Sequence, residues 1–198
     1  MKNYFMAIAT ALFLLLLTGC NKDGGSSGDG SAIETLADAM AAYSKITDIW
    51  NDELRPQLAT DDQTFTNFVI NGESGTAIVN GKYSEINQSS SNTSYNEFNM
   101  SVTVDFKDYT GKNGAKLSGG LHFYELSDTR CTNFTCATHS SYQYYSLTQD
   151  NTVLPVAISF LENGKKYSDK VYIDADKASG RLSWDISLLN GKQEKFSW

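Results

Sequence analysis

The chain has 198 residues, with 23 acidic side chains against 16 basic ones and a formal net charge of −7 at pH 7. An acidic chain without a basic cluster is a poor match for nucleic acid or for an anionic lipid surface, so we expect neither as an electrostatic partner. Its size is typical of one globular domain behind a short leader.

The first nineteen residues have the pattern of a cleavable export signal. Lys2 precedes a continuous apolar run from Tyr4 to Leu17, and a basic start, an apolar centre and small residues in that order are typical of a secretory signal peptide. A helix over the run is about 21 Å long, whereas the hydrocarbon core of a bilayer is about 30 Å thick. We therefore predict a signal peptide over residues 1–19, with a short anchor helix as the alternative.

The leader ends in Leu17-Thr18-Gly19-Cys20. These four residues resemble the lipobox of bacterial lipoproteins, in which Leu, a small or hydroxyl residue and Gly or Ala precede an invariant Cys. The resemblance implies a diacylglyceryl group on the Cys20 thiol, cleavage before Cys20, and acylation of the new amino group, for example by palmitate. Two or three acyl chains anchor a protein to a membrane almost permanently. The alternative is an ordinary signal peptide in which Cys20 is incidental.

The same resemblance carries an expectation about sorting. Lipoproteins with Asp after the lipidated Cys tend to stay in the inner membrane of Gram-negative bacteria, and Asn21 occupies that position here. The expected location is therefore the bacterial cell envelope, and the outer membrane if the cell is Gram-negative.

Residues 20–30 are predicted to comprise the lipidated Cys20 and a flexible tether. No apolar residue occurs between Asn21 and Gly30, and Gly and Ser at this density form a flexible coil. Lys2 is the one charged side chain of the leader, so its removal takes the net charge from −7 to −8. Residues 31–198 are predicted to form a single globular domain.

That domain is predicted to open with an amphipathic helix over about residues 31–55. Ser31-Ala32-Ile33-Glu34 fits a capping box, and Pro56 is expected to stop the helix after Arg55. The apolar positions follow at steps of three and four, apart from the polar Thr47, at Ile33, Leu36, Met40, Tyr43, Trp50 and Leu54. This face is predicted to lie across a sheet, and a lid over a lipid pocket is the alternative use of the same face.

From about residue 64 to 198 the apolar period changes to two, which predicts strands. The clearest alternations run over Phe98–Phe106, Leu154–Phe160 and Leu182–Leu188, with less regular strands at Thr76–Tyr83, Leu117–Leu126, Tyr142–Leu147 and Tyr167–Ile173. Turn dipeptides separate them at Asn71-Gly72, Asn113-Gly114, Asn163-Gly164, Ser179-Gly180 and Asn190-Gly191, while Asn80-Gly81 suits either a turn or a strand interior. Short strands joined by turns indicate a mainly β fold, an antiparallel sandwich or open barrel.

Two polar stretches are predicted to lie between strands. Asn87–Ser94 is predicted to be a mobile loop. Asp174, Asp176 and Ser179-Gly180 weakly resemble a calcium loop, but Ala178 stands where a third oxygen ligand belongs and no Glu follows at the right distance, so an exposed hairpin turn is preferred.

Cys131 and Cys136 are the cysteines left once Cys20 is lipidated. In an exported protein we predict a disulfide between them. The alternative is a metal site in which His139, and His122 from a neighbouring strand, join the two thiolates. We predict no metal and no cofactor.

The aromatic side chains near the cysteines are the candidate ligand contacts. Tyr142, Tyr144 and Tyr145, together with Phe123, Tyr124 and Phe134, form an aromatic region that suits a sugar or peptide platform, although core packing explains such residues equally well.

The sequence lacks the local signatures of hydrolases, phosphate loops and dinucleotide sites. We therefore predict no catalytic residues and a non-enzymatic lipoprotein that contacts the membrane through its anchor and binds an envelope protein or glycan. A carrier of a hydrophobic ligand, with the helix as lid, and an envelope hydrolase are the alternatives.

Overall fold

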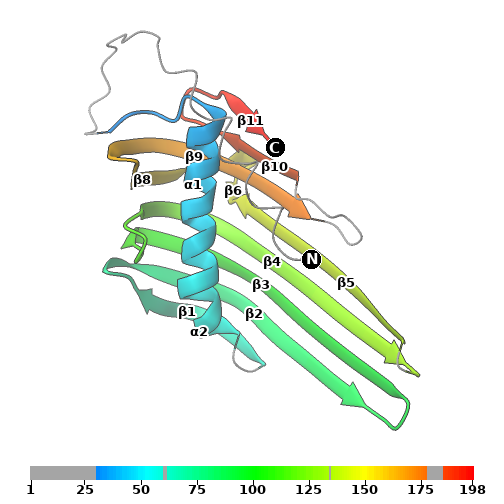
Figure 1. Cartoon of the computed structure of the whole chain (residues 1–198). Helices are drawn as coiled ribbons and strands as arrows, with labels where there is room; N and C mark the ends of the chain where they lie inside the picture. Colours follow the sequence, from blue (N-terminus) through cyan, green and yellow to red (C-terminus); the bar gives the residue numbers. More distant parts are fainter. Residues whose placement is uncertain (1–29, 60–61, 134, 178–184) are drawn as a thin grey trace.

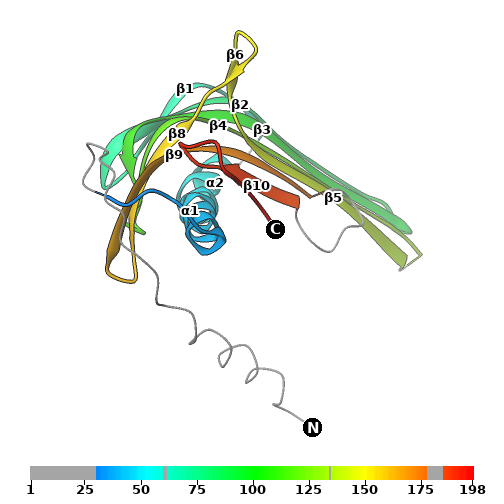
Figure 2. The ribbon, with the colours of Figure 1, turned by 90° about the horizontal axis from the view of Figure 1, so that it is seen from above.

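A helix lies in the concave face of a large, strongly curved antiparallel sheet (Figure 1). The computed structural model describes residues 30–59, 62–133, 135–177 and 185–198. Figure 2 shows the sheet arching over the helix, with one small hairpin projecting from the opposite, convex face. The predicted mainly β, antiparallel fold with an N-terminal helix is confirmed.

The helical segments follow one another without a break and are α1 (Leu36–Asp48), η1 (Ile49–Leu54) and α2 (Arg55–Leu58). The strands are β1 (Gln63–Asn71), β2 (Ser74–Ser89), β3 (Thr93–Thr110), β4 (Lys116–Thr132), β5 (Thr135–Ser146), β6 (Thr148–Gln149), β7 (Thr152–Val153), β8 (Val156–Glu162), β9 (Lys165–Lys177), β10 (Asp185–Leu189) and β11 (Lys195–Ser197).

The helix begins later than predicted, at Leu36. Thr35 is its N-cap, and Asp38 completes a capping box with it. Ser31 instead pairs with the edge of β9, where its amide bonds to the Lys166 carbonyl and its carbonyl accepts from the Ser168 amide. Those bonds keep Ser31 extended, so the predicted capping box at Ser31 is wrong.

Pro56 does not end the helix, as had been predicted, because the preceding turns are widened. Residues Ile49–Leu54 form a π-helix in which the Arg55 amide bonds to the Trp50 carbonyl, and the chain stays helical to Leu58. A proline ring inside an α-helix clashes with the carbonyl four residues earlier, and a π-helical turn shifts that carbonyl.

The buried face of the helix is only partly the predicted one. Trp50 and Leu54 are fully buried, but Leu36 and Met40 are 44% and 45% exposed. The N-terminal half is buried through small side chains and one isoleucine, namely Ala39, Ala42 and Ile46. Alanines allow the helix axis to approach the sheet closely, and this turns the larger Leu36 and Met40 away.

The strands pair in the order β1-β2-β3-β4-β5-β9-β10-β11, and β8 pairs with both β4 and β9. β5 and β8 are collinear, because β4 pairs with β5 through residues 121–132 and with β8 through residues 116–118. They act as one strand that is interrupted by the projecting β6–β7 hairpin.

The predicted alternation of apolar residues is confirmed where the structure describes it. Val102, Val104 and Phe106 in β3 are buried, as are Ile158 and Phe160 in β8. Asn80-Gly81 lies inside β2, and the other turn dipeptides connect strands, except Ser179-Gly180, which lies outside the described residues together with Leu182 and Trp184.

Two predicted loops are strands. Asn87–Ser94 forms the end of β2, a tight turn and the start of β3, so the mobile-loop prediction is wrong. Asp174 and Asp176 lie within β9, paired with β5 and β10, so these two residues are not part of the predicted hairpin turn, while Ser179-Gly180 lies outside the described residues. In both places neighbouring strands supply backbone partners, and pairing outweighs the low strand propensity of Asn, Ser and Asp.

Four strands continue well beyond the helix (Figure 1). We call this extension the arm, and it comprises residues 84–89 of β2, 93–99 of β3, 126–132 of β4 and 135–141 of β5. Its two faces carry alternate residues of each strand, and the concave face is continuous with the face that packs on the helix.

Candidate functional site

Glu125 is the least expected residue of the core. It lies on β4 at a position facing the helix and is 1% exposed. Its Oε1 accepts hydrogen bonds from Trp50 Nε1 at 2.6 Å and from the Tyr144 hydroxyl at 2.9 Å, and its Oε2 accepts from Arg55 Nε at 2.8 Å. A buried carboxylate is tolerated only when such donors replace its hydration.

Aromatic packing fixes these donors in place. The Trp50 ring stacks on Phe123 with centroids 4.0 Å apart, and Tyr144 packs edgewise on Trp50. Arg55 lies over the Phe98 ring, 5.5 Å from its centroid. Burial, and then the charge of Glu125, raise the pKa of Tyr144, so its hydroxyl stays protonated and donates.

A cleft of about 440 Å³ opens beside this cluster, between the helix and strands β5 and β9. It is lined by Tyr43, Thr47, Asn51, Arg55, Glu125, Tyr142, Tyr144 and Lys177. The volume lies in the range of small-molecule sites, and the lining combines aromatic rings with a few hydrogen-bonding groups. Such a surface suits a ligand that has both apolar faces and hydroxyl or amide groups.

The structure separates the three tyrosines named as candidate contacts. Tyr142 and Tyr144 both line the cleft. Tyr145 lies on the convex face, 39% exposed, with its ring stacked on His122 at a centroid distance of 4.8 Å. Successive residues of a strand point to opposite faces, so the three could never share one site. Phe134 lies outside the described residues.

Sequence reasoning missed Glu125, Arg55 and Trp50 as a group. The signal for Glu125 was present, since it follows Leu121 and Phe123 at a spacing of two, where an apolar residue is expected. Trp50 and Arg55 lie on the helical segment, 75 and 70 positions earlier, and the period of a strand gives no information about such contacts.

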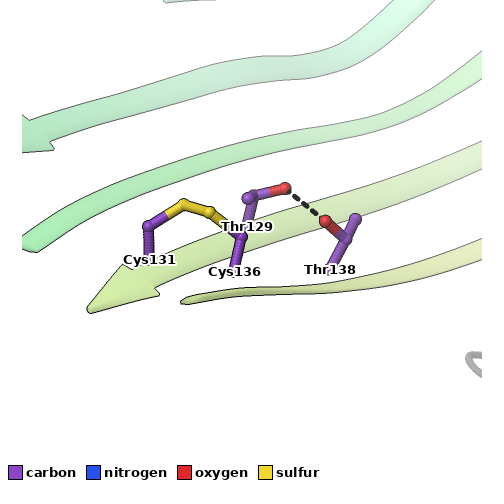
Figure 3. The surroundings of a disulfide bond; sticks show 4 residues. All are labelled: Thr129, Cys131, Cys136 and Thr138. Carbon is purple, nitrogen blue, oxygen red and sulfur yellow. Dashed lines mark hydrogen bonds between the residues drawn. A yellow bond between two sulfur atoms is a disulfide. The ribbon is translucent and has the colours of Figure 1, made fainter. Parts of the chain in front are cut away.

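The predicted disulfide between Cys131 and Cys136 is confirmed. The two residues are directly opposite each other at the ends of β4 and β5, and Thr129 bonds to Thr138 one row further in, at 3.0 Å (Figure 3). Because both sulfur atoms are bonded to each other, they are not available as metal ligands, and His122 lies on the opposite face of β4.

The convex face carries three aspartates, Asp174, Asp176 and Asp185, around a shallow hollow at the β9–β10 edge. Across the described residues, no group of three or more His, Cys, Asp or Glu side chains is arranged to hold a metal ion.

Cys20, the predicted signal peptide and the tether up to residue 29 lie outside the described residues. Within the described part of the chain, no helix is long and apolar enough to cross a membrane. No protein-family model, curated protein or solved structure matches the chain.

Proposed function

We propose that the protein is a lipid-anchored component of the bacterial cell envelope whose β domain binds a glycan, without catalysis, in the cleft beside the helix. The cleft itself is the observation on which this proposal rests. It offers the rings of Tyr43, Tyr142 and Tyr144 together with the polar groups of Asn51 and Lys177.

The chemistry of the cleft favours a sugar over a purely apolar ligand. One face of a sugar ring is rich in C–H groups and packs on aromatic rings, while its hydroxyl groups need donors and acceptors at the rim. Thr47, Asn51 and Lys177 supply such groups around the tyrosines. A peptide partner is the competing occupant, and the binding experiment below tells the two apart.

The way in which the helix is held argues against its use as a lid. Trp50 and Arg55 bond to Glu125 on β4, and Glu53 accepts from the Tyr109 hydroxyl at 3.0 Å and from the Lys112 amide at 2.8 Å. Opening the helix would break all of these bonds and expose its buried side chains, so the cleft at its side is the more accessible site.

The hydrogen bonds of Glu125 also support a role without catalysis. Glu125 is 1% exposed, and three donors from the surrounding walls hold its two oxygen atoms. A general base or nucleophile must come within hydrogen-bond reach of the substrate, and burial keeps a ligand in the cleft from approaching this carboxylate, so it suits positioning of the cleft walls.

The lipid anchor is proposed because Leu17–Cys20 resembles a lipobox. The position of Ser31, where the folded domain begins, indicates which end of the sheet would face the membrane. Ser31 is bonded to β9 next to the β8–β9 turn, at the opposite end of the sheet from the tip of the arm (Figure 1). A Gly-rich coil of about ten residues has a root mean square length of about 16–19 Å. The β8–β9 end would therefore lie near the membrane, with the arm directed away from it.

The test is glycan binding by the full chain, exported in bacteria and purified in detergent. Isothermal titration calorimetry with cellulose, chitin, mannan and starch oligosaccharides should detect saturable binding to at least one. Tyr142→Ala should abolish this binding, whereas Tyr145→Ala, the neighbouring tyrosine on the opposite face, should preserve it. Thermal melting checks that both variants are folded. No binding to any of the four classes, or equal loss in both variants, would overturn the proposal.

A further inference from the structure

The side chains that follow the cleft along the sheet lie on the concave face of the arm. Glu125 is opposite Met100 and Tyr142, and the next row outwards contains Phe98, Ser127 and Ser140. The row after that contains Asn96, Thr129 and Thr138. We call these six side chains of the two outer rows the track.

We propose that the track extends the binding site of the cleft, so that the ligand is a linear, uncharged polysaccharide that occupies several sugar subsites. This inference rests on the proposed function, because the track is a second part of the same site. Along β4, from Glu125 to the disulfide, the concave face is about 20 Å long at about 3.3 Å per residue. That length accommodates several consecutive sugar rings.

The segregation of charge between the two faces of the arm supports an uncharged ligand. The six track residues are one aromatic ring, one amide and four hydroxyl groups. Within the arm, the charged side chains of β3, β4 and β5 lie on the convex face, where Arg130 approaches Asp128 and lies over the Tyr95 ring, and His139 approaches Asp128.

One acidic residue lies on the concave side at the outer strand of the arm. Glu85 of β2 accepts hydrogen bonds from the Tyr83 hydroxyl at 2.9 Å and from the Asn87 amide group at 2.8 Å. Its charge would oppose an anionic polymer such as nucleic acid or an acidic glycan. Arg55, which lies over Phe98 of the track, is already paired with Glu125, so a neutral glycan is the polymer that suits this face.

The covalent structure of the arm also suits a binding platform. The disulfide joins β4 to β5 at the tip, and the Thr129–Thr138 hydrogen bond joins the same strands along the track (Figure 3). A surface held in one shape before binding loses less conformational entropy when the ligand arrives. The arm is exposed on both faces and none of its described side chains is buried, so cross-links between its strands take the place of a core in keeping it rigid.

The experiment compares short and long members of the oligosaccharide class that binds in calorimetry, using the full chain in detergent. A hexasaccharide should bind about tenfold tighter than the disaccharide, because the added sugars reach the track. The track variant Ser127→Ala/Thr138→Val/Ser140→Ala should remove this gain and leave disaccharide affinity unchanged. The matched control, Ser84→Ala/Thr135→Val/Ser141→Ala, makes the same replacements on the convex face and should keep it.

The possible outcomes separate this inference from the proposed function. Equal affinity for the two lengths overturns the track and leaves the cleft proposal standing. A gain with length that survives in the track variant, or is lost equally in the control, also overturns the track. Absence of binding to every oligosaccharide, of either length, removes the proposed function and this inference together.

Discussion

Replacing Glu125 with Gln keeps the size of the side chain and removes its charge, and we expect a large loss of stability. The carboxylate accepts three hydrogen bonds in a site that is 1% exposed. Glutamine has one acceptor oxygen, and its amide group would face at least one of the donors Trp50, Arg55 and Tyr144.

The magnitude follows from the cost of that mismatch. A hydrogen bond to a charged group contributes about 1.5–3 kcal/mol, and leaving a buried donor unpaired costs about 1–3 kcal/mol. The side chain of Arg55 is 37% exposed, so water compensates part of its loss. We expect the free energy of unfolding to fall by about 2–4 kcal/mol, which at this size lowers Tm by several degrees or more.

Urea unfolding followed by far-UV circular dichroism measures this change, with the exposed Glu73→Gln as the control that should leave the midpoint unaltered. If Glu125→Gln unfolds at the wild-type urea concentration, the carboxylate does not hold the helix to the sheet, and the reasoning given for the cleft walls is refuted.

Three further predictions concern other parts of the chain. Cys20→Ala should move the protein from the membrane fraction to the soluble fraction or leave it uncleaved, and unchanged membrane attachment would refute the lipobox interpretation. Replacing Cys131 and Cys136 with Ala should reduce hydrogen-exchange protection in the arm but not around the helix, because closing so short a loop contributes about 2 kcal/mol locally; uniform loss of protection would contradict this. Burial lowers the pKa of His122 below its ordinary value of 6.5, so the unfolded chain binds more protons there and stability should fall as the pH drops below about 6.5. His122→Gln should flatten this decline in urea midpoints, and an unchanged slope would exclude His122 as its source.

The sequence predicted the strands well because their burial is one-sided and repetitive. Met100, Val102 and Val104 alternate with polar residues, and a sheet with one face on a helix and one in water requires that pattern. The alternation holds wherever a strand lies under the helix. It fades in the arm, where neither face is buried, so the polar stretch Asn87–Ser94 has the composition of a loop although it pairs as strand.

The helix was predicted less well because its boundaries depend on distant partners. Ser31 is held by β9, and Thr35 takes over as the N-cap. Leu36 and Met40 satisfied the helical period, yet the narrow space beside the sheet selected Ala39 and Ala42 for burial. The helix propensity of a residue carries no information about the distance between the helix and the sheet.

The candidate site could be predicted only in part for a related reason. Tyr142 and Tyr144 are recognisable in the sequence as part of an aromatic region, and the alternation of side chains along a strand places Tyr145 on the other face. Glu125 and Arg55 meet only after the helix crosses β4. When a site forms between elements far apart in the sequence, its only local sign is a residue that breaks the pattern of its strand, such as a glutamate at a position where an apolar residue is expected.

The hairpin that separates β5 from β8 is a place where extra residues could be inserted without disturbing the sheet. The chain leaves the sheet after Ser146 and rejoins the same line of pairing at Val156, with β4 spanning both sides of the gap. The hairpin between these points turns at Asp150 and Asn151, both in the left-handed conformation, and projects from the convex face, away from the helix (Figure 2). An epitope tag or a fluorescent label placed at that turn would be displayed to solvent while the strands beneath it kept their register.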